Sequence, residues 1–406
     1  MLLPYSRVEL QTISAAARVQ PPENTANFAL ISISLLTIST RKFIILSVCV
    51  DNNYKKERNS MTKREERSEK IRKFILEEVD THPGDITNLV MGKFEISRQA
   101  SWRHINNLVE EGLLEAKGNT RAREYSSKPL GQIKLTIAVS AELEEDEVWR
   151  NEIDPLMNSV NQNIKSICQY GFTEMLNNVI AHSSATNVTI EFSHYTNKIK
   201  FVVNDDGIGI FDKIQKELRL SDKRHAILEL AKGKLTTDPV RHTGEGIFFT
   251  SRVFDEFSII SGGLYFSHST DGDDWLLEAE RKNSEAGTAV FLEIDPESER
   301  TLTEVFDKFS GDGDYGFTKT HVPVALAKYG DENLVSRSQA RRLLTRFDRF
   351  REVFLDFEGV DTIGQAFADE IFRVFQNENP EIRITWRNES EQIRKTILRA
   401  KSREQE

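Results

Sequence analysis

The pattern of apolar and polar positions divides the chain after residue 60 into three regions. In the first region, 61–128, apolar residues recur at helical spacing and then alternate briefly, as in a small helical domain with a β-hairpin. Ser97 suits the N-cap of the last helix, and Gly112 suits its end. The predicted elements are helices over 67–79, around 85–91 and over 97–111, a strand from residue 113 and a hairpin tip at 117–120.

The second region, 131–297, mixes period-two alternation with helical spacing, which predicts a sheet covered by helices. Between 211 and 243 no long apolar pattern survives, and basic residues recur instead. We therefore expect a two-layer α/β sandwich with one irregular segment. The predicted strands are 133–139, 187–193, 198–204, 257–261, 264–267, 275–279 and 288–294, and the predicted helices are 145–166, 167–182 and 247–253.

The third region, 312–406, follows a polar break rich in Gly and Asp at 310–316. Strand and helix patterns alternate here, and this order predicts an α/β layer. The whole chain is thus expected to be a multidomain α+β protein. The predicted strands are 317–323, 352–357 and 382–386, and the predicted helices are one contained within 334–350 and those over 363–375 and 390–399.

Composition narrows the class of protein. The 406 residues leave room for two to four domains, each with its own core. A net charge of −10 argues against uniform coating of nucleic acid, although a local basic face remains compatible with it. Cys49 and Cys168 are far apart and lack metal-ligand spacing, so we expect neither a disulfide framework nor a zinc site, and a cytoplasmic location.

The first sixty residues differ in composition from the rest. Residues 28–50 are apolar, but Arg41 and Lys42 interrupt them, and neither side reaches the length of a membrane span. Met61 opens a strongly charged segment with helical character. We expect residues 1–60 to be a non-native or disordered extension, with a weak membrane anchor as the alternative and no stable membrane association.

Four short motifs in the second region carry the chemistry. They are GFTEMLNNVIAHS at 171–183, DDGIGI at 205–210, HTGEGI at 242–247 and AGTAV at 286–290. In this order and at these gaps, the first three resemble the N, G1 and G2 boxes of the GHKL ATP-binding superfamily, which includes type II topoisomerases, MutL, histidine kinases and anti-sigma kinases. The resemblance implies a Bergerat-type ATPase sandwich over residues 131–297, with ATP and Mg²⁺ as ligands.

The residue types fit the roles that the resemblance implies. Glu174 and Asn178 lie four positions apart, on one face of a helix. Asn178 offers an amide oxygen to Mg²⁺, and Glu174 orients or deprotonates a water at the γ-phosphate. Asp205 accepts a hydrogen bond from the adenine amino group, and the hydroxyl of Thr288 contacts the adenine water network. Four glycines would let the backbone approach the phosphates closely, namely Gly207, Gly209, Gly244 and Gly246.

In GHKL relatives the stretch corresponding to 211–243 is a lid over the triphosphate. One of its basic side chains is expected to reach the γ-phosphate, although the default for each is an exposed, solvated charge. The candidates are Lys223, Arg224, Lys232, Lys234 and Arg241. His182 either contacts phosphate or caps its helix. No segment resembles the phosphoacceptor box of a histidine kinase, so a histidine autokinase is disfavoured.

The run SRQA…RHINNLVEEGLLE…TRAREY closely resembles a winged helix-turn-helix domain of bacterial regulators over residues 61–128. The resemblance places helix 97–111 in the major groove of DNA. Trp102 on the outward face stacks on DNA or on another protein. A protein-docking winged helix is the alternative. The expected DNA contacts are Arg98, Gln99 and Arg103 on the helix and Arg121 and Arg123 in the wing.

The run VFLDFEGVDTIGQAFADEIFRVF at 353–375 looks like the STAS-type fold of anti-sigma antagonists, and the STAS-like domain is expected over residues 312–406. Such antagonists carry a phosphorylatable hydroxyl at the start of a helix. Here the corresponding stretch is Gly364, Gln365 and Ala366, so a protein-docking role is expected, with structural packing as the alternative.

Together these patterns predict a cytoplasmic, ATP-binding regulator of transcription, with hydrolysis left open. Nucleotide state would be coupled to DNA through 61–128 and to a protein partner through the carboxyl-terminal domain. A homodimer is compatible with the pattern. The rival hypothesis is a serine/threonine protein kinase of the anti-sigma, partner-switching type, with Glu174 as its base.

Overall fold

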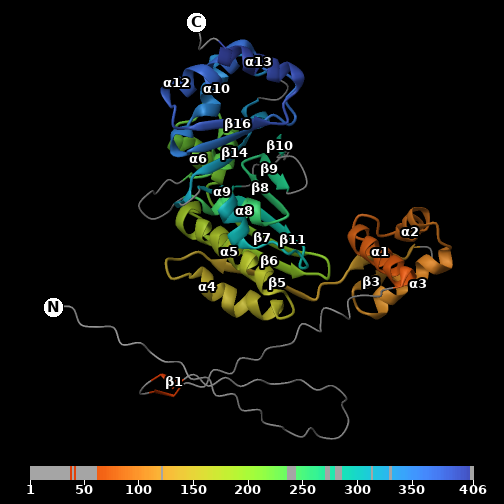
Figure 1. The fold of residues 1–406 in the computed structure, drawn as a ribbon. Helices are drawn as coiled ribbons and strands as arrows, with labels where there is room; N and C mark the ends of the chain where they lie inside the picture. The colour runs from red at the N-terminus through yellow and green to blue at the C-terminus, as the bar shows by residue number, and fades with distance from the viewer. Residues whose placement is uncertain are drawn as a thin grey trace. The chain divides into compact units, whose positions relative to one another are not determined.

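The computed structural model shows three folded regions in the chain (Figure 1). Ile71–Glu406 forms one compact unit. In the predicted extension 1–60 only two short paired strands are described, β1 (Thr37–Ile38) and β2 (Arg41–Lys42), so most of that prediction lies outside the described residues. The other residues that the structure describes are 62–119, 122–235, 244–269, 275–278, 286–311, 314–328 and 332–402.

The first region contains the predicted helices and hairpin. Three helices, α1 (Lys63–Glu78), α2 (Ile86–Phe94) and α3 (Arg98–Glu110), precede an antiparallel pair, β3 (Leu114–Lys117) and β4 (Glu124–Ser127). The hydroxyl oxygen of Ser97 accepts the backbone N–H of Ala100 at 3.2 Å, as predicted for the N-cap. The buried apolar residues of this region, from Ile71 to Tyr125, form a core of their own.

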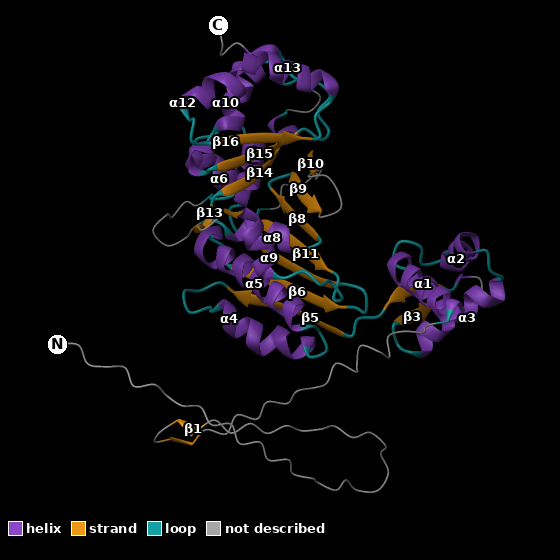
Figure 2. Ribbon diagram, viewed as in Figure 1, coloured by secondary structure: helices purple, strands orange, loops and turns teal. Residues whose placement is uncertain are grey.

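A seven-stranded antiparallel sheet dominates the second region (Figure 2). Its strands lie in the order β10-β9-β8-β11-β7-β6-β5, and burial alternates along them because one face packs against helices. Two of these helices, α5 (Gln162–Asn178) and α8 (Gly246–Val253), pack against each other. The strands are β5 (Gly131–Ala138), β6 (Asn187–His194), β7 (Ile199–Asp205), β8 (Glu256–Ser261), β9 (Leu264–Ser269), β10 (Trp275–Glu278) and β11 (Thr288–Ile294).

Helix boundaries in this region differ from the prediction. The expected helix over 145–166 is interrupted, because α4 (Glu145–Val148) runs into a π-helical turn at Trp149–Ile153 and a 3₁₀ turn at Asp154–Met157. Pro155 lacks a backbone N–H and starts a tighter turn instead of continuing the ladder. The helix expected over 167–182 begins earlier, at Gln162, and its last turn, Val179–Ser183, is π-helical.

The segment without an apolar pattern contains two helices, α6 (Ile210–Leu218) and α7 (Arg224–Lys232). Every residue of α7 from His225 to Lys232 is buried. A helix that is buried on all sides has no polar stripe, so the periodicity on which the prediction depends is absent.

The third region is built on a parallel sheet of β14 (Lys319–Pro323), β15 (Glu352–Asp356) and β16 (Arg383–Arg387). Parallel strands need crossover connections, which the helices supply. The helix predicted within 334–350 is present as α10 (Arg337–Leu344), and the helix predicted over 363–375 becomes π-helical from Glu370. The remaining elements are α9 (Leu302–Phe309), β12 (Ser310–Gly311), β13 (Asp314–Phe317), 3₁₀ turns Val324–Ala327 and Phe347–Arg349, α10 (Arg337–Leu344), α11 (Gln365–Asp369), the π-helical Glu370–Phe375, α12 (Gln376–Glu378) and α13 (Glu391–Ser402).

The expectation of a separate core for each domain holds for the first region only. Buried apolar residues from Val148 to Ala400 form one continuous cluster across the second and third regions. Part of this cluster is aromatic: Phe248 of α8 lies 5.0 Å from Phe309 and 4.5 Å from Phe317, measured between ring centroids. Among the described residues, none of the helices has both the length and the apolar composition that a bilayer crossing needs.

Candidate functional site

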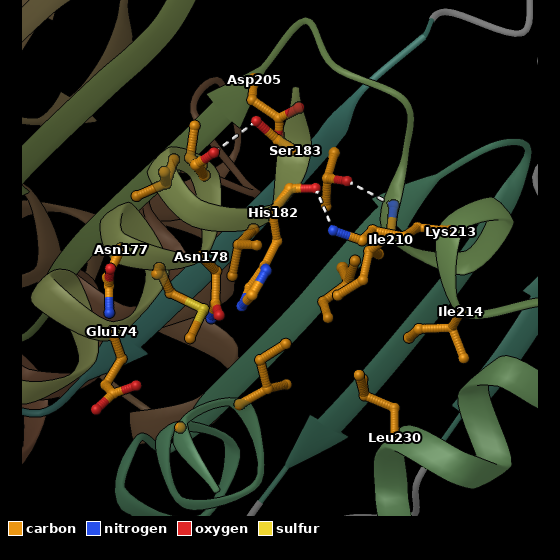
Figure 3. A pocket seen from close by; sticks show the side chains of 18 of the residues that line it. Glu174, Asn177, Asn178, His182, Ser183, Asp205, Ile210, Lys213, Ile214 and Leu230 are labelled. Carbon is orange, nitrogen blue, oxygen red and sulfur yellow. Dashed lines mark hydrogen bonds between the residues drawn. The ribbon is translucent and has the colours of Figure 1, made fainter. Parts of the chain in front are cut away.

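A pocket of about 310 Å³ lies where the end of α5, the end of β7, the start of β11, the start of α6 and the start of α8 meet (Figure 3). All the residues predicted for the nucleotide site except Gly207 line it. These are Glu174, Asn178, Asp205, Gly209, Gly244, Gly246 and Thr288. Side chains from four distant stretches of sequence therefore converge on one cavity.

Glu174 lies directly against the first residue of α8. A Cβ atom added to Gly246 would come within 1.9 Å of the Glu174 Oε2 atom, so a larger residue there would displace the Glu174 carboxylate from this position. Burial raises the pKa of Glu174 above its usual range, and the nearby carboxylates of Glu145 and Glu245 raise it further. A carboxyl group with a raised pKa is better suited to accept a proton near neutral pH.

Asn178 ends α5, one turn after Glu174. Its side-chain nitrogen is buried and has no hydrogen-bond partner among the residues that the structure describes. A buried N–H donor without a partner costs free energy, so its presence in a pocket lining favours a ligand that supplies an acceptor, such as a phosphate oxygen. The described residues contain no cluster of three His, Cys, Asp or Glu that could hold a metal. The amide oxygen of Asn178 is the atom that would bind Mg²⁺, which takes most of its ligands from phosphate and water.

Asp205 is buried at the end of β7, opposite Thr288 of β11. Its Oδ1 atom accepts the backbone N–H of Gly207 at 2.8 Å, which explains why Gly207 supports the site from outside the pocket lining. Burial raises the pKa of Asp205, although the bond from Gly207 opposes this shift. Thr288 Oγ1 accepts the backbone N–H of Ile210 at 3.0 Å and so holds the loop after β7 in place.

Gly287 is a structural residue of the site to which the sequence analysis assigned no role. Its φ of 104° lies in the region that favours glycine, and a Cβ atom there would fall 1.9 Å from the carbonyl oxygen of Asp205. Its place inside the fourth motif was the signal that could have identified it.

Among the described residues, a lysine also lines the pocket: Lys213 of α6, to which the sequence pattern assigned no role. Its Nζ atom donates to the carbonyl oxygen of His182, another lining residue, at 2.8 Å. The signal was its position one helical turn after the second motif.

The described candidates from the basic segment lie elsewhere. Lys223 donates to the carbonyl of Gly262, and Arg224 pairs with Asp222. Lys232 is fully buried, so the expectation of a solvated charge is wrong there. Lys234 donates to the carbonyl oxygen of Arg349 at 2.8 Å. Arg241 lies outside the described residues.

The predicted DNA-contact residues lie on the outer face of α3. Arg98, Gln99, Trp102 and Arg103 are exposed, Trp102 by 47%. The other face is buried and includes Ser101, which the sequence analysis missed, with Oγ donating to the carbonyl oxygen of Thr87 at 3.0 Å. In the hairpin, the half-buried Arg123 lies 5.4 Å from the centre of the Tyr125 ring. Arg121 lies outside the described residues.

Comparison with known families supports one of the three predicted domain types. The model of the STAS-like domain of unknown function (DUF4325) matches residues 339–394, from α10 to α13. The carboxyl-terminal region is therefore STAS-like, as predicted. No curated protein matches the chain significantly.

Proposed function

We propose that the protein is an ATP-binding regulator of transcription that couples the nucleotide state of a GHKL-type module to DNA and to a protein partner. One observation carries the proposal. Residues of four separate motifs line one pocket, where the buried side-chain nitrogen of Asn178 still lacks an acceptor. The GHKL module would comprise residues 131–297.

The lining residues have complementary tasks in this proposal. Asn178 holds Mg²⁺, Asp205 accepts a hydrogen bond from the adenine amino group, and the glycine backbone faces the phosphates. ATP with Mg²⁺ supplies a phosphoanhydride bond that water can cleave. Glu174, whose pKa is raised by burial, accepts the proton of that water.

The other two regions supply the output. The exposed face of α3, with Arg98, Gln99 and Arg103, fits a winged helix-turn-helix domain whose recognition helix enters the major groove. The STAS-like region would bind a protein partner. The rival is a serine/threonine protein kinase in which Glu174 deprotonates a hydroxyl of another protein.

Binding of Mg-ATP to Asn178→Ala and Asp205→Asn tests the proposal. Asn178→Ala removes the amide, and Asp205→Asn replaces a charged acceptor by a neutral amide; loss of a charge-assisted bond in a closed site costs about 1.5–3 kcal/mol and weakens binding about ten- to a hundredfold. Equilibrium titration with a fluorescent ATP analogue measures the loss. Asp206→Asn is the matched control, because Asp206 neighbours Asp205 but bonds to Asn187 outside the pocket lining. Unchanged affinity in both pocket variants would refute the nucleotide site.

Radiolabelled ATP then separates the activities. Released phosphate indicates an ATPase, label on a protein indicates a kinase, and bound label alone indicates a sensor. Glu174→Gln keeps ATP binding but slows phosphate release, because an amide cannot take up the proton. Equal turnover in this variant and the parent would remove Glu174 from its role.

A further inference from the structure

Helix α7 lies between the pocket and the STAS-like region. Leu230 on this helix lines the pocket, as does Leu235 shortly after its end. Glu229 and Lys232 of the same helix are also buried, with exposures of 2% and 0%, although neither lines the pocket. One helix thus contributes apolar side chains to the pocket wall and carries buried charges directed elsewhere.

Those buried charges meet a residue of the STAS-like region. Lys232 Nζ lies 2.6 Å from Glu229 Oε1, and Arg346 Nη1 lies 3.0 Å from Glu229 Oε2. We call Glu229, Lys232 and Arg346 the buried triad. Lys232 also donates to the carbonyl oxygens of Thr345 at 2.8 Å and Arg342 at 3.3 Å.

The STAS-like region also caps the carboxyl end of α7. The last carbonyl groups of a helix have no partner within the helix and must find one elsewhere. Arg346 donates from Nη1 to the carbonyl oxygen of Glu229 at 3.2 Å and from Nη2 to that of Gly233 at 2.7 Å. Thr320 Oγ1 donates to the carbonyl oxygen of Lys232 at 2.7 Å. A cationic side chain at this position is also favoured by the helix dipole.

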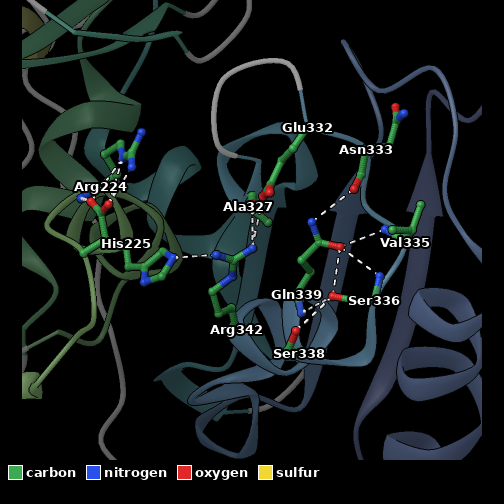
Figure 4. Close-up of polar contacts among 11 residues, drawn as sticks. Arg224, His225, Ala327, Glu332, Asn333, Val335, Ser336, Ser338, Gln339 and Arg342 are labelled. Carbon is green, nitrogen blue, oxygen red and sulfur yellow. Dashed lines mark hydrogen bonds and ion pairs between the residues drawn. The ribbon is translucent and has the colours of Figure 1, made fainter.

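The start of α7 is held from the same side. Arg342 Nη1 lies 3.1 Å from His225 Nε2, and the same guanidinium reaches Glu332 at 3.2 Å (Figure 4). Both ends of the helix therefore contact one region of the protein. Just beyond the helix, the backbone N–H of Leu235 donates to the carbonyl oxygen of Gly244 at 3.0 Å, which joins two lining residues.

We propose that the STAS-like region sets the ligand affinity of the pocket by holding α7, and that Arg346 is the positioning residue of this contact. A polar contact with forked geometry tolerates few arrangements, so a change in the STAS-like region shifts α7 and with it Leu230 and Leu235. By thermodynamic linkage, a ligand that binds more tightly when α7 is held in place must stabilise the contact between α7 and the STAS-like region by the same free energy. The identity of the ligand as Mg-ATP rests on the proposed function.

Arg346→Met in the full chain is the test, with Arg341→Met as the matched control. Arg341 is 70% exposed and pairs with Glu370 inside the STAS-like region, so its loss leaves α7 untouched. In Arg346→Met we expect the Kd for a fluorescent ATP analogue with Mg²⁺ to rise fivefold or more. Hydrogen exchange should accelerate at the amides of α7 and of Leu235, and not in β5 or β6. In Arg341→Met both readouts should match the parent.

Two milder variants keep the test decisive if Arg346→Met does not fold. Arg346→Lys keeps the charge beside Glu229 but loses the fork that also reaches Gly233, so we expect it to recover only part of the affinity. Thr320→Val removes one capping hydroxyl and should raise the Kd less than Arg346→Met does.

Each outcome decides the matter. Faster exchange in α7 together with weaker binding supports the proposal. Unchanged exchange in the Arg346 and Thr320 variants overturns it, and so does faster exchange with unchanged affinity. If the parent fails to bind Mg-ATP, the proposed function fails by itself. The exchange of Leu235, a lining residue, then still decides whether Arg346 holds the pocket wall.

Discussion

The two ends of the chain differ in how their cores are built. The buried residues of the amino-terminal region form a cluster of their own, whereas those of the STAS-like region join the cluster of the central region. Shared packing transmits displacements, since close-packed interiors move together and do not deform smoothly. We therefore expect the pocket to be coupled more tightly to the STAS-like region than to the amino-terminal region.

The shared core reaches the pocket through two helices. Helix α8 begins at Gly246 in the pocket lining and carries Phe248 into the aromatic group with Phe309 and Phe317. Helix α7 also connects the pocket to the STAS-like region, but it does so through the polar contacts of the buried triad. We expect the apolar contacts to supply most of the stability of this junction and the polar ones to restrict its geometry.

A matched pair of core truncations tests most directly whether the two regions have separate cores. Ile371 in the STAS-like region and Ile75 in the amino-terminal region are both fully buried and helical. Replacing either by Ala should cost about 2–5 kcal/mol of unfolding free energy. Hydrogen exchange should accelerate in β6 and β7 for Ile371→Ala, and only within residues 63–127 for Ile75→Ala. Equal acceleration of β6 and β7 in both variants would contradict the separation of the cores.

Alkaline titration tests whether the junction between α7 and the STAS-like region contains a desolvated charge. Burial lowers the pKa of Lys232 to about 8, against an ordinary value of 10.5, and the attraction of Glu229 only partly offsets this. Between pH 8 and pH 10.5 the unfolded chain binds more protons at Lys232 than the folded protein does. The contribution of Lys232 therefore makes the unfolding free energy rise with pH. The slope is at most about 1.4 kcal/mol per pH unit.

Urea unfolding of the parent and of Lys232→Met measures this contribution. The difference between parent and variant should grow in favour of the parent from pH 8 to pH 10.5 and stay level below pH 8. Lys134→Met, which removes a lysine that is 71% exposed, is the control. A level difference over the whole range would show that Lys232 is not held in a desolvated site.

The smallest effect concerns the amino-terminal region alone. Arg123→Ala should lower the slope of log affinity for DNA against log salt by about one unit, because it removes one phosphate contact. Mg-ATP affinity should not change, since Arg123 belongs to the region with the separate core. An unchanged salt slope would remove Arg123 from the DNA contact, and an altered Mg-ATP affinity would show coupling between the two regions.

The strands of the central sheet were predictable because alternation reports directly which face is buried. The strand predicted over 288–294 is β11 (Thr288–Ile294), with alternating burial as expected. Helix ends were less predictable, since the π-helical turns after Val148 and Asn178 depend on packing that the local sequence does not record.

The pocket residues and the surroundings of α7 differ in whether they could be predicted from the sequence. The pocket residues could be predicted from the sequence, because Glu174, Asn178 and Asp205 stand in motifs whose order and gaps resemble those of the GHKL superfamily. The residues that surround α7 became evident only in the folded structure. Lys232 looks like a solvated lysine until Glu229, Thr345 and Arg346 enclose it, and the last two lie more than a hundred residues away. Burial of a charge depends on partners distant in sequence, and no local pattern records them.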